Sequence, residues 1–116
     1  MAAILVMDDD DMIRSLLTKL LEREGHTVTT FPDAAPALAS ANFDQMDLII
    51  TDLAMPTTGE YATKVIREQG HTTPIIVMSG FITEEKAQYL KSLGAQEIIR
   101  KPFNLLAFLQ VVNRFI

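Results

Sequence analysis

The residues best suited to chemistry are acidic and stand directly after two largely apolar runs of the chain. The run 3–7 leads into Asp8 and Asp9, and the run 47–51 leads into Asp52. A strand buried on both faces of a parallel sheet is continuously apolar, and ligands bind outside the carboxyl ends of such strands. We therefore expect these three carboxylates to meet in one pocket.

Three clustered carboxylates repel one another and favour a bound cation. At a separation of about 4 Å each pair costs roughly 1–4 kcal/mol, between water-like and surface-like dielectric constants. Mg²⁺ suits such a pocket because it prefers oxygen ligands, accepts few carboxylates, keeps several waters and coordinates phosphate oxygens. The sequence thus predicts a magnesium site formed by Asp8, Asp9 and Asp52. His26 and His71 have no second ligand at metal spacing, so we expect both on the surface.

The composition is that of one ordinary globular domain over residues 1–116. Hydrophobic residues make up 48% of the chain and charged residues 22%, which allows a real core but no second domain. The net charge of −5 argues against direct binding of nucleic acid, which needs a basic face. We see no stretch suited to membrane insertion, no signal peptide and no cysteine, and we therefore expect a cytoplasmic protein.

Short apolar runs alternate with helical patterns along the chain. Strands are predicted at 3–7, 27–31, 47–51, 75–78 and 96–100, and helices at 11–24, 33–40, 84–93 and 105–115. A further helix is predicted to follow the loop that contains Pro56 and Gly59 and to end at about Gln69. Asp10 or Asp11, Thr83 and Asn104 are suited to cap the helices that they precede or open. Five strands and five helices in strict alternation predict an α/β fold, a parallel sheet with right-handed crossovers and helices on both faces.

Four segments at the predicted strand ends resemble the receiver (phosphoacceptor) domains of two-component response regulators. They are residues 4–10 (ILVMDDD), 52–56 (DLAMP), 74–80 (PIIVMSG) and 101–103 (KPF). Each segment alone is a weak signal, but four in the right order, each at a strand end, form a specific one that spans essentially the whole chain. The resemblance implies a flavodoxin-like, doubly wound fold with the strand order 2-1-3-4-5.

The resemblance also assigns roles to the acidic cluster. Asp52 is expected to be the phosphoacceptor, a carboxylate nucleophile that forms an acyl phosphate. Asp9, Asp52 and the backbone carbonyl of Ala54 are expected to ligate Mg²⁺ directly, and Asp8 through a water. Phosphoryl transfer needs mainly positioning and charge neutralisation, which this cluster and its cation would provide.

Lys101 and Ser79 are expected to contact the transferred phosphoryl group, the lysine as a compact point charge and the serine through its hydroxyl. The family also has a cis bond at the position of Lys101–Pro102, which would help to aim the lysine. The implied phosphodonor is a histidine kinase or a histidine phosphotransfer protein, and phosphorylation would change the affinity for an output partner that the sequence does not name. The chain would catalyse its own phosphorylation without being a turnover enzyme.

The sequence departs from the family pattern at four places. The segment 55–59 is one residue shorter than usual before its glycine, which affects the loop geometry. Ile98 stands where an aromatic residue usually reports phosphorylation, so either the readout is altered or Ile98 simply packs in the core. Neither Ala54 nor Phe81 can orient an attacking water by a hydrogen bond, which predicts slow loss of phosphate from Asp52.

Three other classes of protein share some of these features. A phosphatase with an aspartyl intermediate normally has a second Asp two residues after the nucleophile, where Ala54 stands. A flavin-binding module has a Ser-, Thr- and Gly-rich phosphate loop after its first strand, and the four aspartates 8–11 would repel that phosphate. The third alternative is a receiver-like interaction module with weak or no phosphorylation-dependent switching, which Ile98 makes credible.

Overall fold

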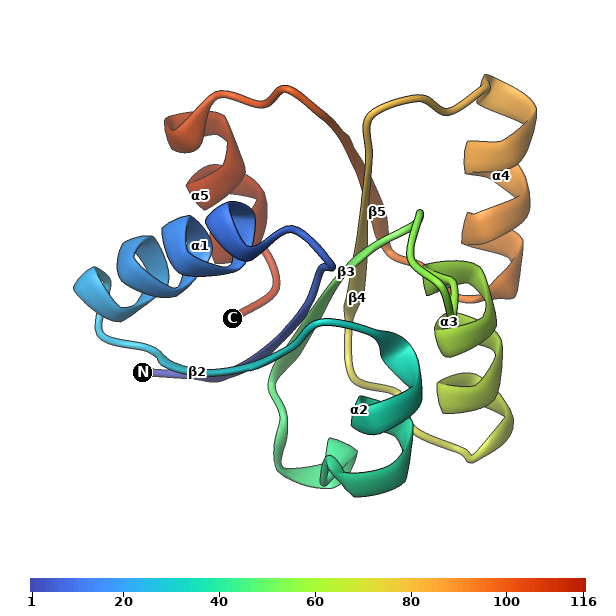
Figure 1. Ribbon diagram of the computed structural model, residues 1–116, viewed down its shortest axis with the longest axis horizontal. Coiled ribbons are helices and arrows are strands. Elements are labelled where there is room, and N and C mark those ends of the chain that lie inside the picture. Colours follow the sequence, from blue (N-terminus) through green and yellow to red (C-terminus); the bar gives the residue numbers. More distant parts are fainter.

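The structure, a computed structural model, describes residues 1–116 around one five-stranded sheet (Figure 1). The strands are β1 (Ala3–Met7), β2 (Thr27–Phe31), β3 (Leu48–Asp52), β4 (Ile75–Ser79) and β5 (Glu97–Arg100). Their order is β2-β1-β3-β4-β5 and every pairing is parallel. The predicted α/β fold and its strand order are therefore confirmed.

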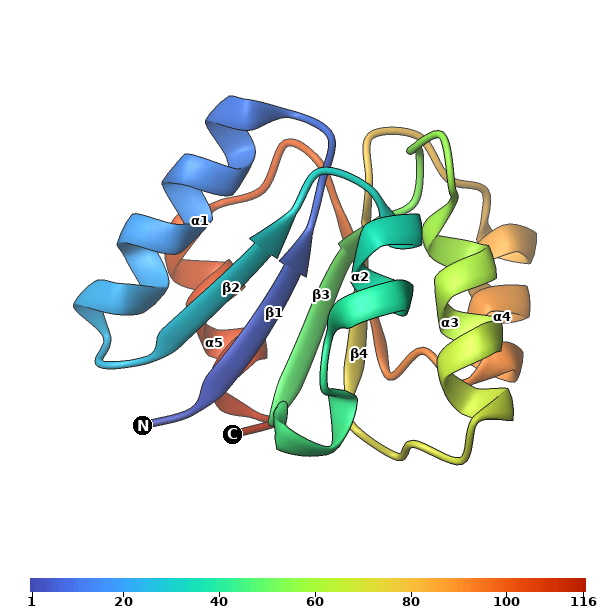
Figure 2. The same cartoon turned by 60° about the horizontal axis from the view of Figure 1, so that its bottom comes forward.

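Helices cover both faces of the sheet, as the alternation predicted (Figure 2). They are α1 (Asp11–Arg23), α2 (Ala34–Ser40), α3 (Gly59–Glu68), α4 (Glu84–Leu93) and α5 (Leu105–Asn113), with a short 3₁₀ helix η1 (Phe43–Gln45). Helices α1 and α5 lie on one face, and α2, α3 and α4 lie on the other (Figures 1 and 2). The result is a three-layer sandwich with the sheet in the middle.

The alternation of side chains along β1 divides the core into two halves. Ile4 and Val6 pack toward α1 and α5, whereas Leu5 and Met7 pack toward α2, α3 and α4. All four side chains are completely buried. This double burial explains why β1 has no polar residue before Asp8, and the same holds for the apolar parts of β3 and β4.

The helix termini follow their capping residues. Asp10 caps α1 and accepts a hydrogen bond from the Met12 backbone N–H at 2.8 Å, and Thr83 and Asn104 cap α4 and α5 as predicted. The predicted ends of α1 and α5 lie one and two residues too far along the chain. Helix η1 was not predicted, because three residues are too few to leave a periodic pattern.

None of the helices is long and apolar enough to span a lipid bilayer.

Candidate functional site

The carboxyl ends of four strands converge at one edge of the sheet. Asp8 follows β1, Asp52 ends β3, Ser79 ends β4 and Lys101 follows β5. The register of the parallel strands sets how far along the sheet each of these residues lies: Met7 is paired with Thr51, Asp52 with Met78 and Ser79 with Arg100. Residues separated by up to 93 positions in the sequence thereby meet, as the strand-end pattern predicted.

The structure brings the three predicted metal ligands together. Carboxylate oxygens of Asp8, Asp9 and Asp52 all lie within 4.8 Å of one another. Asp8 is completely buried and Asp52 is 6% exposed, whereas Asp9 is exposed at the mouth of the site. A set of hard oxygen donors that is open to water on one side suits Mg²⁺, which binds few carboxylates and keeps part of its hydration shell.

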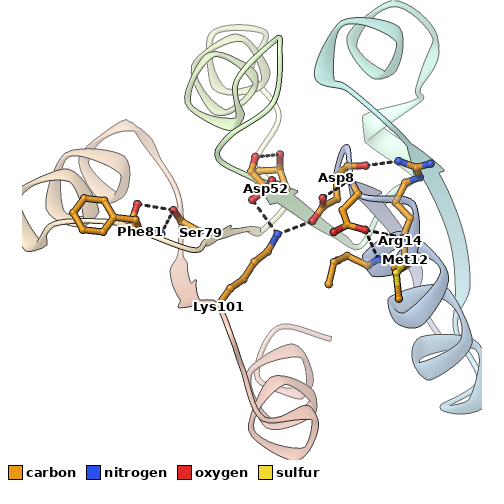
Figure 3. A network of polar contacts seen from close by, with 10 residues as sticks. Asp8, Met12, Arg14, Asp52, Ser79, Phe81 and Lys101 are labelled. Atoms are coloured by element: carbon orange, nitrogen blue, oxygen red, sulfur yellow. Dashed lines mark hydrogen bonds and ion pairs between the residues drawn. The ribbon is translucent and has the colours of Figure 1, made fainter.

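The Lys101 ammonium lies between the two buried carboxylates (Figure 3). Its Nζ donates a hydrogen bond to Asp8 Oδ2 at 3.0 Å and lies 3.2 Å from Asp52 Oδ1. The Lys101 backbone N–H donates to the Ser79 carbonyl at 2.7 Å, and the Lys101–Pro102 bond is cis. Lys101 is thus positioned to neutralise negative charge at the Asp52 carboxylate.

The charges of the cluster are incompletely balanced. Burial raises the pKa of the Asp52 carboxyl and the nearby Asp8 carboxylate raises it further, while Lys101 offsets only part of this effect. Burial lowers the pKa of Lys101, but the hydrogen bond to Asp8 and the charge of Asp52 outweigh it and leave the pKa raised. One ammonium shared by acidic neighbours leaves an excess of negative charge, and that excess would attract a divalent cation.

The loop after β3 is anchored to the site by backbone contacts. The Gly59 N–H donates to the Leu53 carbonyl at 3.1 Å, and the Thr57 N–H donates to the Asp33 carboxylate at 2.7 Å. A Cβ atom at Gly59 would lie 2.3 Å from the Asp52 carbonyl oxygen, so only glycine fits there. The carbonyl of Ala54, the predicted backbone ligand, accepts no hydrogen bond within the protein.

Ser79 is near the cluster, but its hydroxyl is engaged elsewhere. It donates to the Phe81 carbonyl at 2.9 Å and accepts from the Phe81 N–H at 3.3 Å (Figure 3). The hydroxyl would have to release the Phe81 carbonyl to donate to a phosphoryl oxygen. Phe81 is 87% exposed, and its ring points away from the carboxylates (Figure 3).

Ile98 is packed in the core half that faces α2, α3 and α4, and is 8% exposed. Its aliphatic side chain therefore serves as core in this conformation, in line with the simpler of the two interpretations of the sequence. The structure offers no ring at this position that could alternate between a buried and an exposed state.

Sequence reasoning missed two contacts that hold the site together. Arg14 donates to the Asp8 carbonyl, and Asp33 holds the loop that carries Ala54. No local pattern shows either contact, because each depends on the packing of separate elements. The expectation for the histidines was wrong in detail: His26 and His71 are half-buried, His26 accepts from the Ala2 N–H, and His71 pairs with Asp44 at 2.8 Å.

Comparison with known proteins identifies the class. Residues 4–113 match the family described as the response regulator receiver domain, and the chain belongs to this family. It is therefore a signalling domain of the two-component type and not an enzyme that turns over a metabolite. Similar proteins include transcriptional regulators of bacteria and a transcription factor of the fungus Candida albicans.

The similar proteins include one that this chain covers almost completely and longer regulators that it covers in part. The chemotaxis protein CheY4 of Vibrio cholerae superposes with a TM-score of 0.92 at 35% identity, over 100% of this chain and 99% of that one. The transcriptional regulatory protein CpxR of Escherichia coli K12 is 36% identical over 90% of this chain and 44% of its own length. The DNA-binding transcriptional regulator NtrC of Proteus hauseri is 33% identical over 96% of this chain and 24% of its own length. The chain thus spans about a quarter to a half of these two regulators.

Proposed function

We propose that the receiver domain formed by residues 1–116 is a cytoplasmic, phosphorylation-dependent switch in which Asp52 accepts a phosphoryl group from a phosphohistidine donor. The observation that carries the proposal is the bridge from Lys101 to both Asp8 and Asp52, beside three carboxylates within 4.8 Å. Such a constellation has a nucleophile, a cation site and a fixed positive charge. These are the components that phosphoryl transfer requires.

In the proposed reaction an Asp52 carboxylate oxygen attacks phosphorus. The phosphorus–nitrogen bond of the donor breaks as the new phosphorus–oxygen bond forms, and the histidine nitrogen leaves with the electron pair and takes up a proton from water. Asp9, Asp52 and the Ala54 carbonyl would hold Mg²⁺ directly and Asp8 through a water. The bound ion would supply positive charge against the phosphoryl oxygens. Lys101 neutralises the transferred group, and Ser79 donates to it after releasing Phe81.

The test is to incubate the protein with a small phosphodonor and Mg²⁺ and to follow its intact mass and the stability of the product. We expect wild type to gain one phosphoryl group that is labile to hydroxylamine, and Asp52→Ala to gain none. Asp44→Asn, which removes an exposed carboxylate within η1, is the matched control and should react like wild type. A Lys101→Met variant should react about 10²–10³-fold more slowly, as when one preorganised electrostatic group is lost. Labelling that persists in Asp52→Ala would remove the proposal.

The phosphodonor would be a histidine kinase or a histidine phosphotransfer protein. An apolar groove of about 500 Å³ between α1 and the start of α5 borders Lys101 and is lined by Ile13, Leu16, Phe103 and Leu105. A protein phosphodonor that docks beside Lys101 would cover this groove. Leu16→Glu should then slow transfer from a phosphoprotein donor and leave transfer from a small phosphodonor unchanged. If the phosphoprotein donor transferred phosphate to wild type and to Leu16→Glu at equal rates, this docking geometry would be contradicted.

The residues around Asp52 also favour a long-lived acyl phosphate. Ala54 and Phe81 are exposed beside the site and neither side chain has a hydrogen-bonding group. We expect slow self-dephosphorylation, accelerated in a Phe81→Glu variant because a carboxylate there could orient the attacking water. Phosphate release that is already fast in wild type, or unchanged in Phe81→Glu, would count against this expectation.

A second candidate function is an interaction module that carries phosphate without switching. The burial of Ile98 at the usual position of the aromatic reporter favours it. Measuring the affinity for an output partner with and without phosphorylation separates the two: a switch changes the affinity, and a constitutive module does not. The names of CpxR and NtrC indicate regulators of transcription, so a DNA-binding output is the first partner to test.

A further inference from the structure

We infer that Arg14 is a positioning residue for the cation site: it fixes the backbone on which Asp9 stands and so aims that carboxylate at Mg²⁺. This inference rests on the proposed function, because it assumes that Asp9 ligates the ion. Arg14 lies in the first turns of α1, and its side chain is 19% exposed. Figure 3 shows it directed back at the segment that follows β1.

The Arg14 guanidinium connects two acceptors of that segment. Its NH1 donates to the backbone carbonyl of Asp8 at 2.6 Å, and its NH2 is paired with the Asp11 carboxylate. A planar guanidinium presents several donors in fixed directions, so it can satisfy two acceptors at once and hold their relative position. This contact joins the first turn of α1 to the backbone at the exit of β1.

Asp9 itself has no hydrogen bond, so it is restrained only through its two neighbouring peptide groups, which set the direction in which its side chain leaves the backbone. The peptide group before it is held by Arg14 through the Asp8 carbonyl. The peptide group after it is held by Asp8, whose Oδ1 accepts from the Asp10 N–H at 2.9 Å. With the Asp8 N–H bound to the Phe31 carbonyl at 3.1 Å, the turn is fixed on both sides of Asp9.

The position of Asp9 matters because it is the exposed member of the cluster. Asp8 and Asp52 are held by burial and by Lys101, whereas Asp9 lacks both restraints. A group that orients a metal ligand typically changes metal affinity by about 10–100-fold when it is removed. Arg14 would play this part without touching the metal or the phosphoryl group.

Positioning and simple charge predict opposite results, which makes the inference testable. Arg14 is a cation near a cation site, so its removal would strengthen Mg²⁺ binding if only its charge mattered. If it acts by holding the Asp8 carbonyl, its removal weakens binding. Arg14→Lys separates the two further, because it keeps the charge and loses the planar pair of donors.

The experiment is a calorimetric titration of the unphosphorylated protein with Mg²⁺, without any phosphodonor. We expect Arg14→Gln to raise the Mg²⁺ dissociation constant about 10-fold, and Arg14→Lys to raise it in the same direction. The matched control is Arg23→Gln, which removes an exposed arginine from the last turn of the same helix and should bind Mg²⁺ like wild type. Circular dichroism verifies that each variant is folded. If Arg14→Gln does not fold, the result for Arg14→Lys decides the test.

Tighter binding in Arg14→Gln, or unchanged binding in both Arg14 variants while wild type binds Mg²⁺, would overturn the inference and leave the proposed function intact. Wild type that does not bind Mg²⁺ at all would remove the proposed cation site, and the role of Arg14 with it.

Discussion

Charged side chains are paired differently at the two edges of the sheet, where the carboxyl ends and the amino ends of the strands lie. At the carboxyl edge, three carboxylates lie within 4.8 Å and share one lysine. At the amino edge of β4 and β5, the guanidinium of Arg67 is surrounded by neutral acceptors. It donates to the carbonyls of Gly94 and His71 and to the side chain of Gln96 at 2.9–3.2 Å.

The hydrogen bonds at the amino edge stabilise the packing of neighbouring elements. Arg67 joins the end of α3 to the end of α4, and the same Gln96 oxygen accepts from the Ile75 N–H at 2.8 Å. Gly94 has a positive φ of 120°, and a Cβ there would lie 2.7 Å from Arg67 Nε, so this glycine makes room for the guanidinium. The carboxyl edge instead keeps unbalanced charge, which is typical of a functional site. Stability and function are therefore separated at opposite ends of the same strands.

The largest effect on stability is expected at Arg67. Arg67→Met leaves several carbonyl acceptors without their donor, and we expect it to lower the free energy of unfolding by about 3 kcal/mol. Urea unfolding measures this loss. The control Arg23→Met alters an exposed arginine and should change stability by less than about 0.5 kcal/mol. Comparable losses in both variants would show that the amino edge is not a special source of stability.

The next effect tests whether the carboxyl edge also contains a rigid part. Gly59→Ala places a Cβ against the Asp52 carbonyl, and we expect a loss of about 2 kcal/mol from the forced displacement. Mg²⁺ affinity should fall as well, because the shift moves the backbone of Asp52. Gly80→Ala is the control, since a Cβ there meets nothing within 4 Å. Unfolding curves and Mg²⁺ titrations that match for the two variants would contradict this role of Gly59.

A smaller effect of opposite sign is expected at Asp52. Since burial and Asp8 raise the pKa of its carboxyl, the charged form opposes folding. Asp52→Asn should therefore raise the free energy of unfolding by about 1 kcal/mol in Mg²⁺-free buffer, the lower end of the repulsion between two carboxylates. Urea unfolding in a chelating buffer measures it, with Glu68→Gln, which neutralises an exposed carboxylate at the end of α3, as the control. A destabilised Asp52→Asn protein would mean that the carboxyl edge is not under electrostatic strain.

The smallest effect compares the pH dependence of one carboxyl at each edge. Burial raises the pKa of Glu97, but hydrogen bonds from Arg114 and from the Ile98 N–H outweigh it, so the pKa is lowered. The stability from this pair is present above pH 4.5 and is lost as the pH falls through the lower pKa of the folded state. For Asp52 the sign is reversed: its protonation favours the folded state fully below pH 3.8, and this contribution is lost as the pH rises through the raised pKa.

Glu97→Gln should therefore lose less stability than wild type on acidification, by at most about 1 kcal/mol because Arg114 is largely exposed. Asp52→Asn should lose more than wild type over the same range. Urea unfolding at several pH values in Mg²⁺-free buffer measures both slopes, and equal slopes in the two variants would remove this contrast between the edges.

Local patterns were sufficient to predict most of the elements and which residues meet at the carboxyl edge. Continuous apolar runs marked β1, β3 and β4 because both faces of these strands are buried, and the caps Thr83 and Asn104 were confirmed because capping depends on a few neighbouring residues. Helix η1 was missed because it is too short to show a period.

Patterns in the amino-acid sequence were thus enough to predict the fold, the strand order through the family resemblance, and the acidic residues at the strand ends. The contacts that hold these residues became visible only in the packed molecule: Arg14 on the Asp8 carbonyl, Asp33 on the Thr57 N–H and the Ser79 hydroxyl on Phe81. Strand ends follow from burial along the chain, which a run of apolar residues records. Hydrogen bonds between separate elements depend instead on distances and angles that exist only after the layers have packed.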